Sequence, residues 1–332
     1  MCADALCKIW RTNGHFGQYI NPHTLDIRVG NSDAGTMICG ALAECADYFG
    51  REDYLDIALL SAERYFDDYQ KKGFTSGGPL EILNAPDCES AVNLLESLVC
   101  IYEITHDKQW LHRATAFSHY VQTWFYTYNV SFPDTSIYGK LGVRTTGALM
   151  ASSQNRCAVP NICTLSGDVY LRLYRYTGNR RFVTIIQECI HNTHQYISRE
   201  DNPIVTMRGP TLQSGTIHEC IQTGDWTGPP GEIPYEWVTS WTEVAHLLSI
   251  SELPGIYFAP DDNTLVVFDH LNASLQVTES QSLEIIIHNP TQYKAHTRIL
   301  IDRMKTGKLP VDMVSGCLQV VIEAGEKIVV PV

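Results

Sequence analysis

The acidic residues that could do chemistry gather in segments that also carry glycine, proline and aromatic residues. The densest of these segments is Gly77-Gly78-Pro79-Leu80-Glu81-Ile82-Leu83-Asn84-Ala85-Pro86-Asp87-Cys88-Glu89-Ser90. Its carboxylates Glu81, Asp87 and Glu89 could supply the acid and the base that flank a glycosidic bond, one donating a proton and the other activating water. The structural alternative is that Asp87 caps a helix and Glu89 interacts with the dipole of its first turn.

Two further carboxylates accompany apolar helical segments. Asp33 follows Gly30-Asn31-Ser32, so it either lines the same cleft or caps the next helix. We expect Asp168 one turn inside an apolar helix, where an unpaired carboxylate is costly unless it faces a cavity. We therefore predict that the catalytic residues are Asp87, Glu89 and Asp168.

Cations, aromatic residues and other polar groups lie in the long connections and in the helices beside them. Flat aromatic rings can stack on a sugar, and a bidentate arginine suits the carboxylate of a uronic acid. The alternatives are salt bridges for the arginines and core packing for a helical tryptophan. The predicted substrate-binding residues are His23, Arg28, Asp33, Glu81, Arg144, Arg208, Trp226, Trp241 and Glu243.

Metal and cofactor motifs are weak. His191 and His194 are three residues apart but have no suitably spaced acidic ligand, and the adjacent residues His218-Glu219-Cys220 cannot easily chelate one ion. The chain has neither a glycine-rich phosphate loop nor a G-x-S-x-G elbow. We expect no metal and no cofactor.

An internal repeat shows which elements must position these residues. The segments 48–58, 104–114 and 176–186 each combine a short turn with an aromatic and then an aliphatic residue, between apolar residues of helical spacing. Gly50 and Gly178 stand where a helix ends on a left-handed residue. Each segment therefore predicts the turn of an αα-hairpin. The return connections 73–87, 129–159 and 199–235 are long, which is typical of one functional rim.

The helical pattern ends near residue 253. We expect helices at 1–10, 33–50, 52–71, 88–105, 108–127, 143–153, 160–177, 179–198 and 236–251. Alternating runs predict strands at 265–268, 283–287, 298–301, 317–322 and 327–330. The predicted fold is mainly α: an α/α toroid of hairpins over 1–252 and a small β-sandwich over 253–332. A closed ring of six hairpins needs twelve helices, so the chain either starts inside such a ring or builds an incomplete one.

Composition limits the partners. The 332 residues include 24 Lys and Arg against 37 Asp and Glu, a net charge of −13, which disfavours a nucleic-acid partner. No apolar run approaches the roughly 18 residues of a membrane span, and no signal peptide is visible at the start. The 11 cysteines form no C-x-x-C, which favours buried thiols in a reducing compartment. We expect a cytoplasmic protein whose partner is an oligosaccharide or polysaccharide fragment, with a homo-oligomer left open.

Four segments carry a resemblance to a known group of enzymes: 84–97, Ile162-Cys163-Thr164-Leu165-Ser166-Gly167-Asp168, 196–204 and Ser240-Trp241-Thr242-Glu243-Val244. They resemble the six-hairpin glycosidase superfamily, most of all bacterial members with an (α/α)6 toroid and a C-terminal β-domain. These include β-glucuronidase-type and unsaturated-uronyl hydrolases. The resemblance implies catalytic carboxylates at the toroid rim, with Asp87 and Glu89 at the matching positions and Asp33 and Asp168 lining the cleft.

Three functions follow from this reasoning. The first is a glycoside hydrolase that removes a terminal sugar, a uronic acid, by paired-carboxylate catalysis. The second is a polysaccharide lyase on the same toroid, with His23 or Tyr138 as the base and Arg144 as the cation beside the uronate. The third is a carbohydrate-binding relative without catalytic activity.

Overall fold

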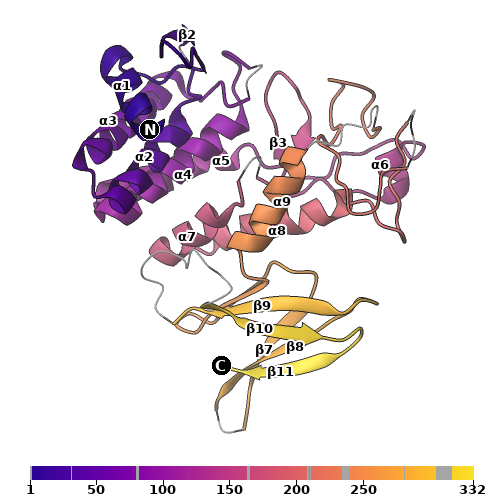
Figure 1. The fold of residues 1–332 in the computed structure, drawn as a ribbon. Coiled ribbons are helices and arrows are strands. Elements are labelled where there is room, and N and C mark those ends of the chain that lie inside the picture. The colour runs from indigo at the N-terminus through magenta and orange to yellow at the C-terminus, as the bar shows by residue number, and fades with distance from the viewer. Residues whose placement is uncertain are drawn as a thin grey trace.

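The computed structural model of the chain describes residues 2–30, 32–79, 82–162, 165–207, 209, 211–233, 240–279, 281–303 and 316–332. Helices dominate the chain as far as Glu252, and strands form the part that follows, as Figure 1 shows. The predicted architecture, mainly α with a C-terminal β-sandwich, is therefore confirmed. Within the described ranges, no helix combines the length and the apolar character needed to cross a membrane.

Three tight turns join helices into antiparallel pairs. The pairs are α2 (Thr36–Phe49) with α3 (Glu52–Lys72), α4 (Cys88–Thr105) with α5 (Lys108–Gln122), and α7 (Asp168–Thr177) with α8 (Arg181–Thr193). The first helix of each pair ends on a left-handed residue, at Gly50, His106 and Gly178, with φ of 64°, 56° and 71°. The three predicted hairpins are thus confirmed.

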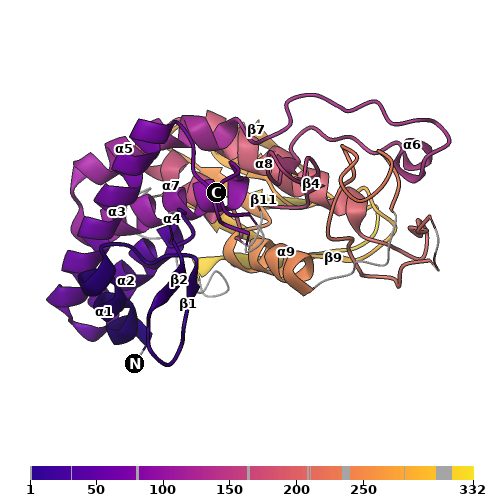
Figure 2. The same cartoon turned by 90° about the horizontal axis from the view of Figure 1, so that it is seen from above.

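The first helices of the pairs form the inner layer of an arc. α4 packs against both α2 and α7, and α1 (Cys2–Asn13) packs against α3. Figure 2 shows α1 to α5 gathered at one end of this arc and the short α6 (Ile137–Leu141) at the other. Three hairpins are half of the six that close a toroid, so the described helices form an incomplete ring.

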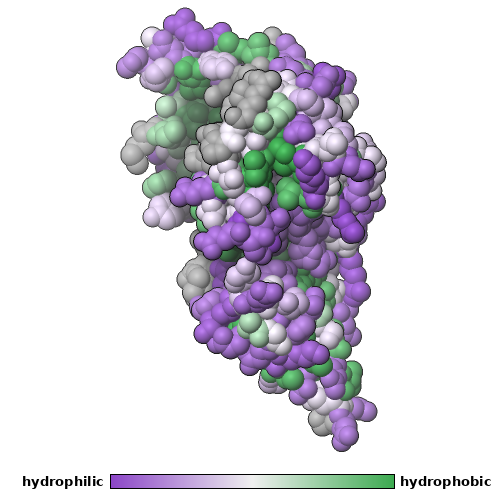
Figure 3. Space-filling model, turned by 90° about the vertical axis from the view of Figure 1, so that its right-hand side faces the viewer, coloured by the Kyte–Doolittle hydropathy of each residue, from purple (hydrophilic) through white to green (hydrophobic). Residues whose placement is uncertain are grey.

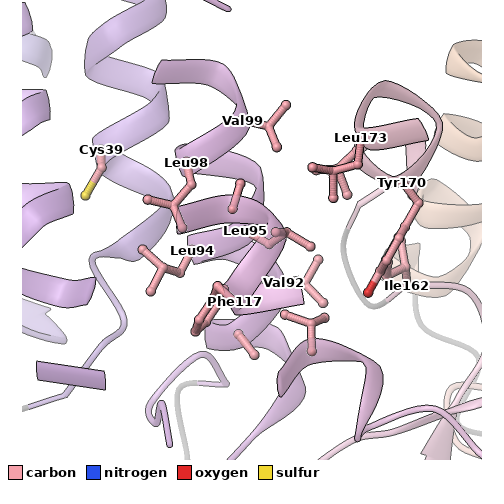
Figure 4. Packing of buried hydrophobic residues seen from close by; sticks show 14 of the residues in the cluster. Cys39, Val92, Leu94, Leu95, Leu98, Val99, Phe117, Ile162, Tyr170 and Leu173 are labelled. Atoms are coloured by element: carbon pink, nitrogen blue, oxygen red, sulfur yellow. The ribbon is translucent and has the colours of Figure 1, made fainter. Parts of the chain in front are cut away.

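α4 is the centre of the helical core. It is apolar on nearly every face, which is typical of a helix surrounded by other helices. Figure 4 shows its side chains between α2, α5 and α7. The buried residues labelled there are Cys39, Val92, Leu94, Leu95, Leu98, Val99, Phe117, Ile162, Tyr170 and Leu173.

The last helix has a different environment. α9 (Ser240–Glu252) has no hairpin partner among the described elements, and its Val244, Leu247 and Ile250 are 50%, 59% and 53% exposed. Figure 3, which faces the side that carries α6, shows hydrophobic patches on the upper, helical part and a mostly hydrophilic strand-rich part below. The incomplete ring therefore leaves apolar helix surface uncovered.

The predicted helix at 143–153 is wrong. This stretch forms loops and strand β3 (Leu149–Met150), which pairs with β4 (Ala158–Val159). Two glycines explain the difference: Gly142 ends α6 with φ of 64°, and Gly147 has φ of 91° against the backbone of α8 at Glu188. The helix expected from residue 160 begins at Asp168, because Gly167 before it has φ of 83°.

The C-terminal part contains two sheets. β10 (Leu318–Ile322), β9 (Ala295–Ile301), β5 (Ile256–Ala259) and β6 (Thr264–Val267) form the first sheet, in that order. The second contains β11 (Lys327–Pro331), β8 (Leu283–His288) and β7 (Asn272–Val277). Apolar residues of both sheets, such as Phe258 and Ile285, share one core. Sequence reasoning missed β5, a short run without alternation, and β7, a mostly exposed strand.

Buried polar contacts join the two parts of the chain. Arg175 of α7 pairs with Asp302 at 2.7 Å between Nε and Oδ2, and the Tyr257 hydroxyl donates to the same oxygen at 2.7 Å. The Tyr174 hydroxyl donates to Asp262 at 2.9 Å. Helix α7 is therefore attached to the first sheet by charged hydrogen bonds.

Candidate functional site

The amino ends of α2 and α4 lie side by side. The Thr36 hydroxyl donates to the Ser90 carbonyl at 3.2 Å, and the Gly40 amide donates to the Ser97 hydroxyl at 2.8 Å. A side chain at Gly40 would come within 2.9 Å of the Ser97 Cα, so the glycine lets the helices approach. The parallel packing brings Asp33 and Asp87, which precede these helices, to one end of the helical domain.

Asp87 is the N-cap of α4. Its Oδ1 accepts from the Ser90 amide at 2.8 Å, and its Oδ2 accepts from the Gly78 amide at 3.2 Å and the Ser90 hydroxyl at 3.0 Å. The side chain is fully buried. Burial raises the pKa of Asp87 to about 6, although these hydrogen bonds oppose the shift. The structure thus shows the predicted cap, and burial moves the pKa of its carboxyl group toward neutral pH.

Asp33 is buried just before α2. Its Oδ2 accepts from the Ser76 amide at 3.0 Å, and Lys72 Nζ lies 3.5 Å from Oδ1. Burial raises the pKa of Asp33, and the Lys72 charge acts in the opposite direction. Asp33 and Lys72 are therefore a buried acid and a partly exposed cation at the same end of the domain.

One short segment, 75–78, connects the two carboxyl groups. Asp33 contacts Ser76, whereas Asp87 bonds to Gly78 and donates its amide to the Thr75 carbonyl at 3.3 Å. Gly77 has φ of 88°, and a Cβ at Gly78 would lie 2.5 Å from the Ser90 nitrogen. Two consecutive glycines are therefore required for this segment to pass between the helix ends.

A polar pocket of about 190 Å³ opens beside Asp33. Asp68 in its wall pairs with Arg64 at 3.5 Å, and Arg64 also donates to the Gly14 carbonyl. The Tyr65 hydroxyl accepts from the Phe16 amide at 3.3 Å. The lining residues are His15, Ser32, Asp33, Arg64, Tyr65, Asp68 and Lys72.

Sequence reasoning predicted only Asp33 of this pocket. The signal it missed is the spacing of Arg64, Asp68 and Lys72, which lie four residues apart along α3 and so share one face. Charged residues of alternating sign at this spacing usually lie on a solvent-exposed helix face. Here they line a pocket only because α3 packs beneath the loop that precedes α2.

The other predicted catalytic residues lie in different settings. Glu89 is partly buried in the first turn of α4. Asp168 is the first residue of α7, and Arg172 Nε lies 3.0 Å from its Oδ2. Arg172 also pairs with Glu103 at 2.9 Å and with Glu96. Burial and the Glu252 carboxylate raise the pKa of Asp168. The structure places Asp168 in a buried ion cluster between α4 and α7.

The predicted substrate-binding residues are dispersed. His23 and Arg28 are exposed on the hairpin of β1 (Tyr19–Ile20) and β2 (Ile27–Val29), and Arg144 is exposed near α6. Trp226 and Trp241 are half-buried against the helical core, and Glu243 is partly buried on α9. Glu81 and Arg208 lie outside the described residues.

The lyase constellation is not brought together. The β1–β2 hairpin with His23 and helix α6 beside Arg144 lie at opposite ends of the helical domain in both Figures 1 and 2. Tyr138 is fully buried, and burial raises the pKa of its hydroxyl well above the usual value. Within the described ranges, no group of three His, Cys, Asp or Glu side chains is arranged to hold a metal ion.

Comparisons with known proteins found structural likenesses at low sequence identity. No protein-family model and no curated protein matches the chain. A GH127 beta-L-arabinofuranosidase from Geobacillus stearothermophilus T6 is 10% identical over 87% of this chain and 52% of that chain, with a TM-score of 0.38. A sugar epimerase from a ruminal bacterium is 13% identical over 73% of this chain and 78% of that chain, with a TM-score of 0.32.

A third likeness is the cellobiose 2-epimerase from Bacillus thermoamylovorans B4167. It is 11% identical over 74% of this chain and 84% of that chain, with a TM-score of 0.28. The chain thus spans about half the length of the arabinofuranosidase and most of the length of the two epimerases.

Proposed function

We propose that the protein is a glycoside hydrolase whose active site lies at the end of the helical domain where α2 and α4 begin. The observation that carries the proposal is the polar pocket in which the carboxyl groups of Asp33 and Asp68 share one wall with Arg64 and Lys72. Glycoside hydrolysis requires two carboxyl groups in different environments, one to donate a proton and one to act on water or on the sugar.

The environments of the two residues suit different roles. Asp33 is buried, and the raised pKa favours the protonated form that a general acid needs. Asp33 would donate its proton to the glycosidic oxygen as the bond to the anomeric carbon breaks. Asp68 is 28% exposed and pairs with Arg64, so it can accept a proton from the water whose oxygen bonds to that carbon.

The substrate we propose carries a uronic acid at its end. Arg64 and Lys72 are the cations of the pocket, and a sugar carboxylate would find both within one small volume. The net charge of −13 repels an anionic substrate at long range, so recognition would depend on such local cations.

Asp87 and Glu89 are the second candidates for the catalytic pair. Asp87 has the raised pKa of an acid, but its side chain is fully enclosed, and Gly78 and Ser90 occupy its oxygens. An Asp→Asn change separates the two roles, because asparagine caps a helix nearly as well as aspartate but cannot donate an acidic proton.

The test is turnover of a panel of aryl glycosides and uronic-acid oligosaccharides by the purified chain and by D33N, D68N, D87N and E89Q. We expect D33N and D68N to lose about 100-fold or more in kcat while their melting curves stay cooperative. The matched control is D107N, because Asp107 also caps a helix, accepting from the Gln109 amide at 2.9 Å, but at the opposite end of the hairpin.

Loss in D87N and E89Q with full activity in D33N and D68N would move the catalytic pair to the start of α4. An unsaturated product would show a lyase, and saturable glycan binding without turnover would show a carbohydrate-binding relative. Full activity in all four variants would refute the proposed site.

A further inference from the structure

A second cavity, of about 260 Å³, lies between the helical domain and the first β-sheet. It is far along the chain from the polar pocket, and the two share no residue. Its walls are the end of α8, helix α9, the segment between α9 and β5, the turn after β6 and strand β9. The lining residues are Ile190, His194, His246, Ser249, Ile250, Leu253, Pro254, Gly255, Phe268, Asp269, His270, His296, Thr297 and Arg298.

Contacts between the two domains hold these walls in place. The Arg298 guanidinium donates to three carbonyls at the carboxyl end of α9, those of Ile250, Ser251 at 3.3 Å and Leu253 at 3.2 Å. A Cβ at Gly255 would overlap the Thr297 hydroxyl, so the chain passes from α9 into β5 directly against β9. The cavity is therefore bounded by a helix end and a strand that are fixed to each other.

The charged groups of the cavity are already compensated. His270 Nδ1 lies 2.5 Å from Asp269 Oδ1, and the side-chain hydrogen bond to Asp269 raises the pKa of His270. Arg298 interacts with the negative end of the α9 dipole through its carbonyl contacts. An ion entering the cavity would have to displace one of these partners, which disfavours a charged ligand.

Two imidazole rings that form no salt bridge among the described residues supply uncharged hydrogen-bonding groups. The ring centroids of His194 and His246 are 5.6 Å apart with the planes at 84°. Burial lowers the pKa of both, which favours the neutral imidazole with one donor and one acceptor. His246 Nδ1 is buried and has no hydrogen-bond partner among the described residues, so a polar ligand atom would satisfy it.

We propose that this cavity binds one small neutral ligand, of the size of a single sugar ring, that has an apolar face and hydroxyl groups. The volume falls just below the roughly 300 Å³ at which drug-sized sites begin, so one ring fits and a chain of rings does not. Ile190, Leu253 and Phe268 form the apolar walls, and His194 and His246 face the hydroxyl groups. This proposal does not depend on the function proposed for the polar pocket.

The test titrates the full chain with D-glucose, D-galactose and L-arabinose, and with D-glucuronate as a charged comparator, while the melting temperature and the histidine ring NMR signals are recorded. We expect saturable binding of a neutral sugar with a shift of the His246 signals. H246F keeps an aromatic ring, although a larger one, but removes both ring nitrogens, and we expect it to weaken binding about tenfold.

Three variants make the test specific. H191F changes an exposed histidine of α8 outside the cavity, and D33N changes the polar pocket, so both should bind the sugar as the unchanged chain does. H246Q retains hydrogen-bonding groups and should bind more tightly than H246F, which also guards against a folding defect in the phenylalanine variant. The absence of neutral-sugar binding up to about 100 mM, equal binding by H246F, or a larger shift of the His246 signals with glucuronate than with any neutral sugar would overturn the proposal.

Discussion

Replacing Arg172 by methionine should destabilise the protein by an amount that depends on pH. Arg172 is 6% exposed, and its guanidinium lies 2.9 Å from Glu103 and 3.0 Å from Asp168 while also pairing with Glu96. Methionine keeps much of the side-chain volume but removes the charge. Three carboxylates of α4 and α7 would then share one buried region without a counter-charge.

The expected cost is about 3–5 kcal/mol at pH 8, the range for breaking a buried ion pair by removing one partner. In large domains each kcal/mol of lost stability lowers the melting temperature by about 2–4 °C, so the melting temperature of R172M should fall on the order of 10 °C. Without Arg172, burial and mutual repulsion raise the pKa of these carboxyl groups further than in the unchanged chain, where burial already raises that of Asp168. The loss of stability in R172M is therefore present at pH values above the folded-state pKa of these carboxyl groups. It is relieved as the pH falls through that pKa and the groups become neutral.

Thermal unfolding at pH 8, 7, 6 and 5, followed by circular dichroism, would measure this effect. The difference between the unchanged chain and R172M should shrink steadily toward pH 5. R11M is the matched control, because Arg11 pairs with Asp53 at the surface and its loss should cost less than about 1 kcal/mol at every pH. A cost below 1 kcal/mol for R172M, or an equal cost at pH 5 and pH 8, would refute the reasoning.

Three further predictions test the helix ends and the cavity histidines. G78A should destabilise the fold by about 1–3 kcal/mol in denaturant unfolding, because the added Cβ would lie 2.5 Å from the Ser90 nitrogen. D87A should cost about 2–4 kcal/mol by leaving the amides of Gly78 and Ser90 without an acceptor, and D87N less than half of that, in paired melting curves. Burial and His246 lower the pKa of His194 from 6.5 to about 4, so between these pH values the unfolded state binds a proton that the folded state does not. The free energy of unfolding therefore falls as the pH drops from 6.5 to 4. H194F should remove on the order of 3 kcal/mol of this loss when the two chains are compared from pH 7 to pH 4.

Local signals were sufficient for the hairpins and the caps. The turns at Gly50 and Gly178, the N-cap at Asp87 and the apolar faces of α4 depend on residues within one or two helical turns. The helix predicted at 143–153 failed because its apolar pattern was counted without the conformations of Gly142 and Gly147. Short apolar runs cannot distinguish a buried strand from a piece of helix.

The candidate site shows the limit of such reasoning. Asp33 and Asp87 could be recognised as carboxylates before helices, but the sequence does not show that one lines a pocket and the other is enclosed. Arg64, Asp68 and Lys72 look like surface charges until α3 is packed beneath the loop before α2. Asp168 looks like an unpaired carboxylate until α7 brings Arg172 and α4 together around it.

The sequence by itself therefore determined the helices of the three hairpins and most strands of the C-terminal part, because turn residues, caps and the period of apolar side chains act over a few residues. It also determined the division into a helical part and a strand-rich part, because the period of the pattern changes after α9. Only the tertiary structure decided which carboxyl groups line a pocket, which cations face them, and that a cavity lined by His194 and His246 lies where α9 meets the first sheet. Burial and pairing depend on residues far apart in the chain, and no local pattern records which of these will meet.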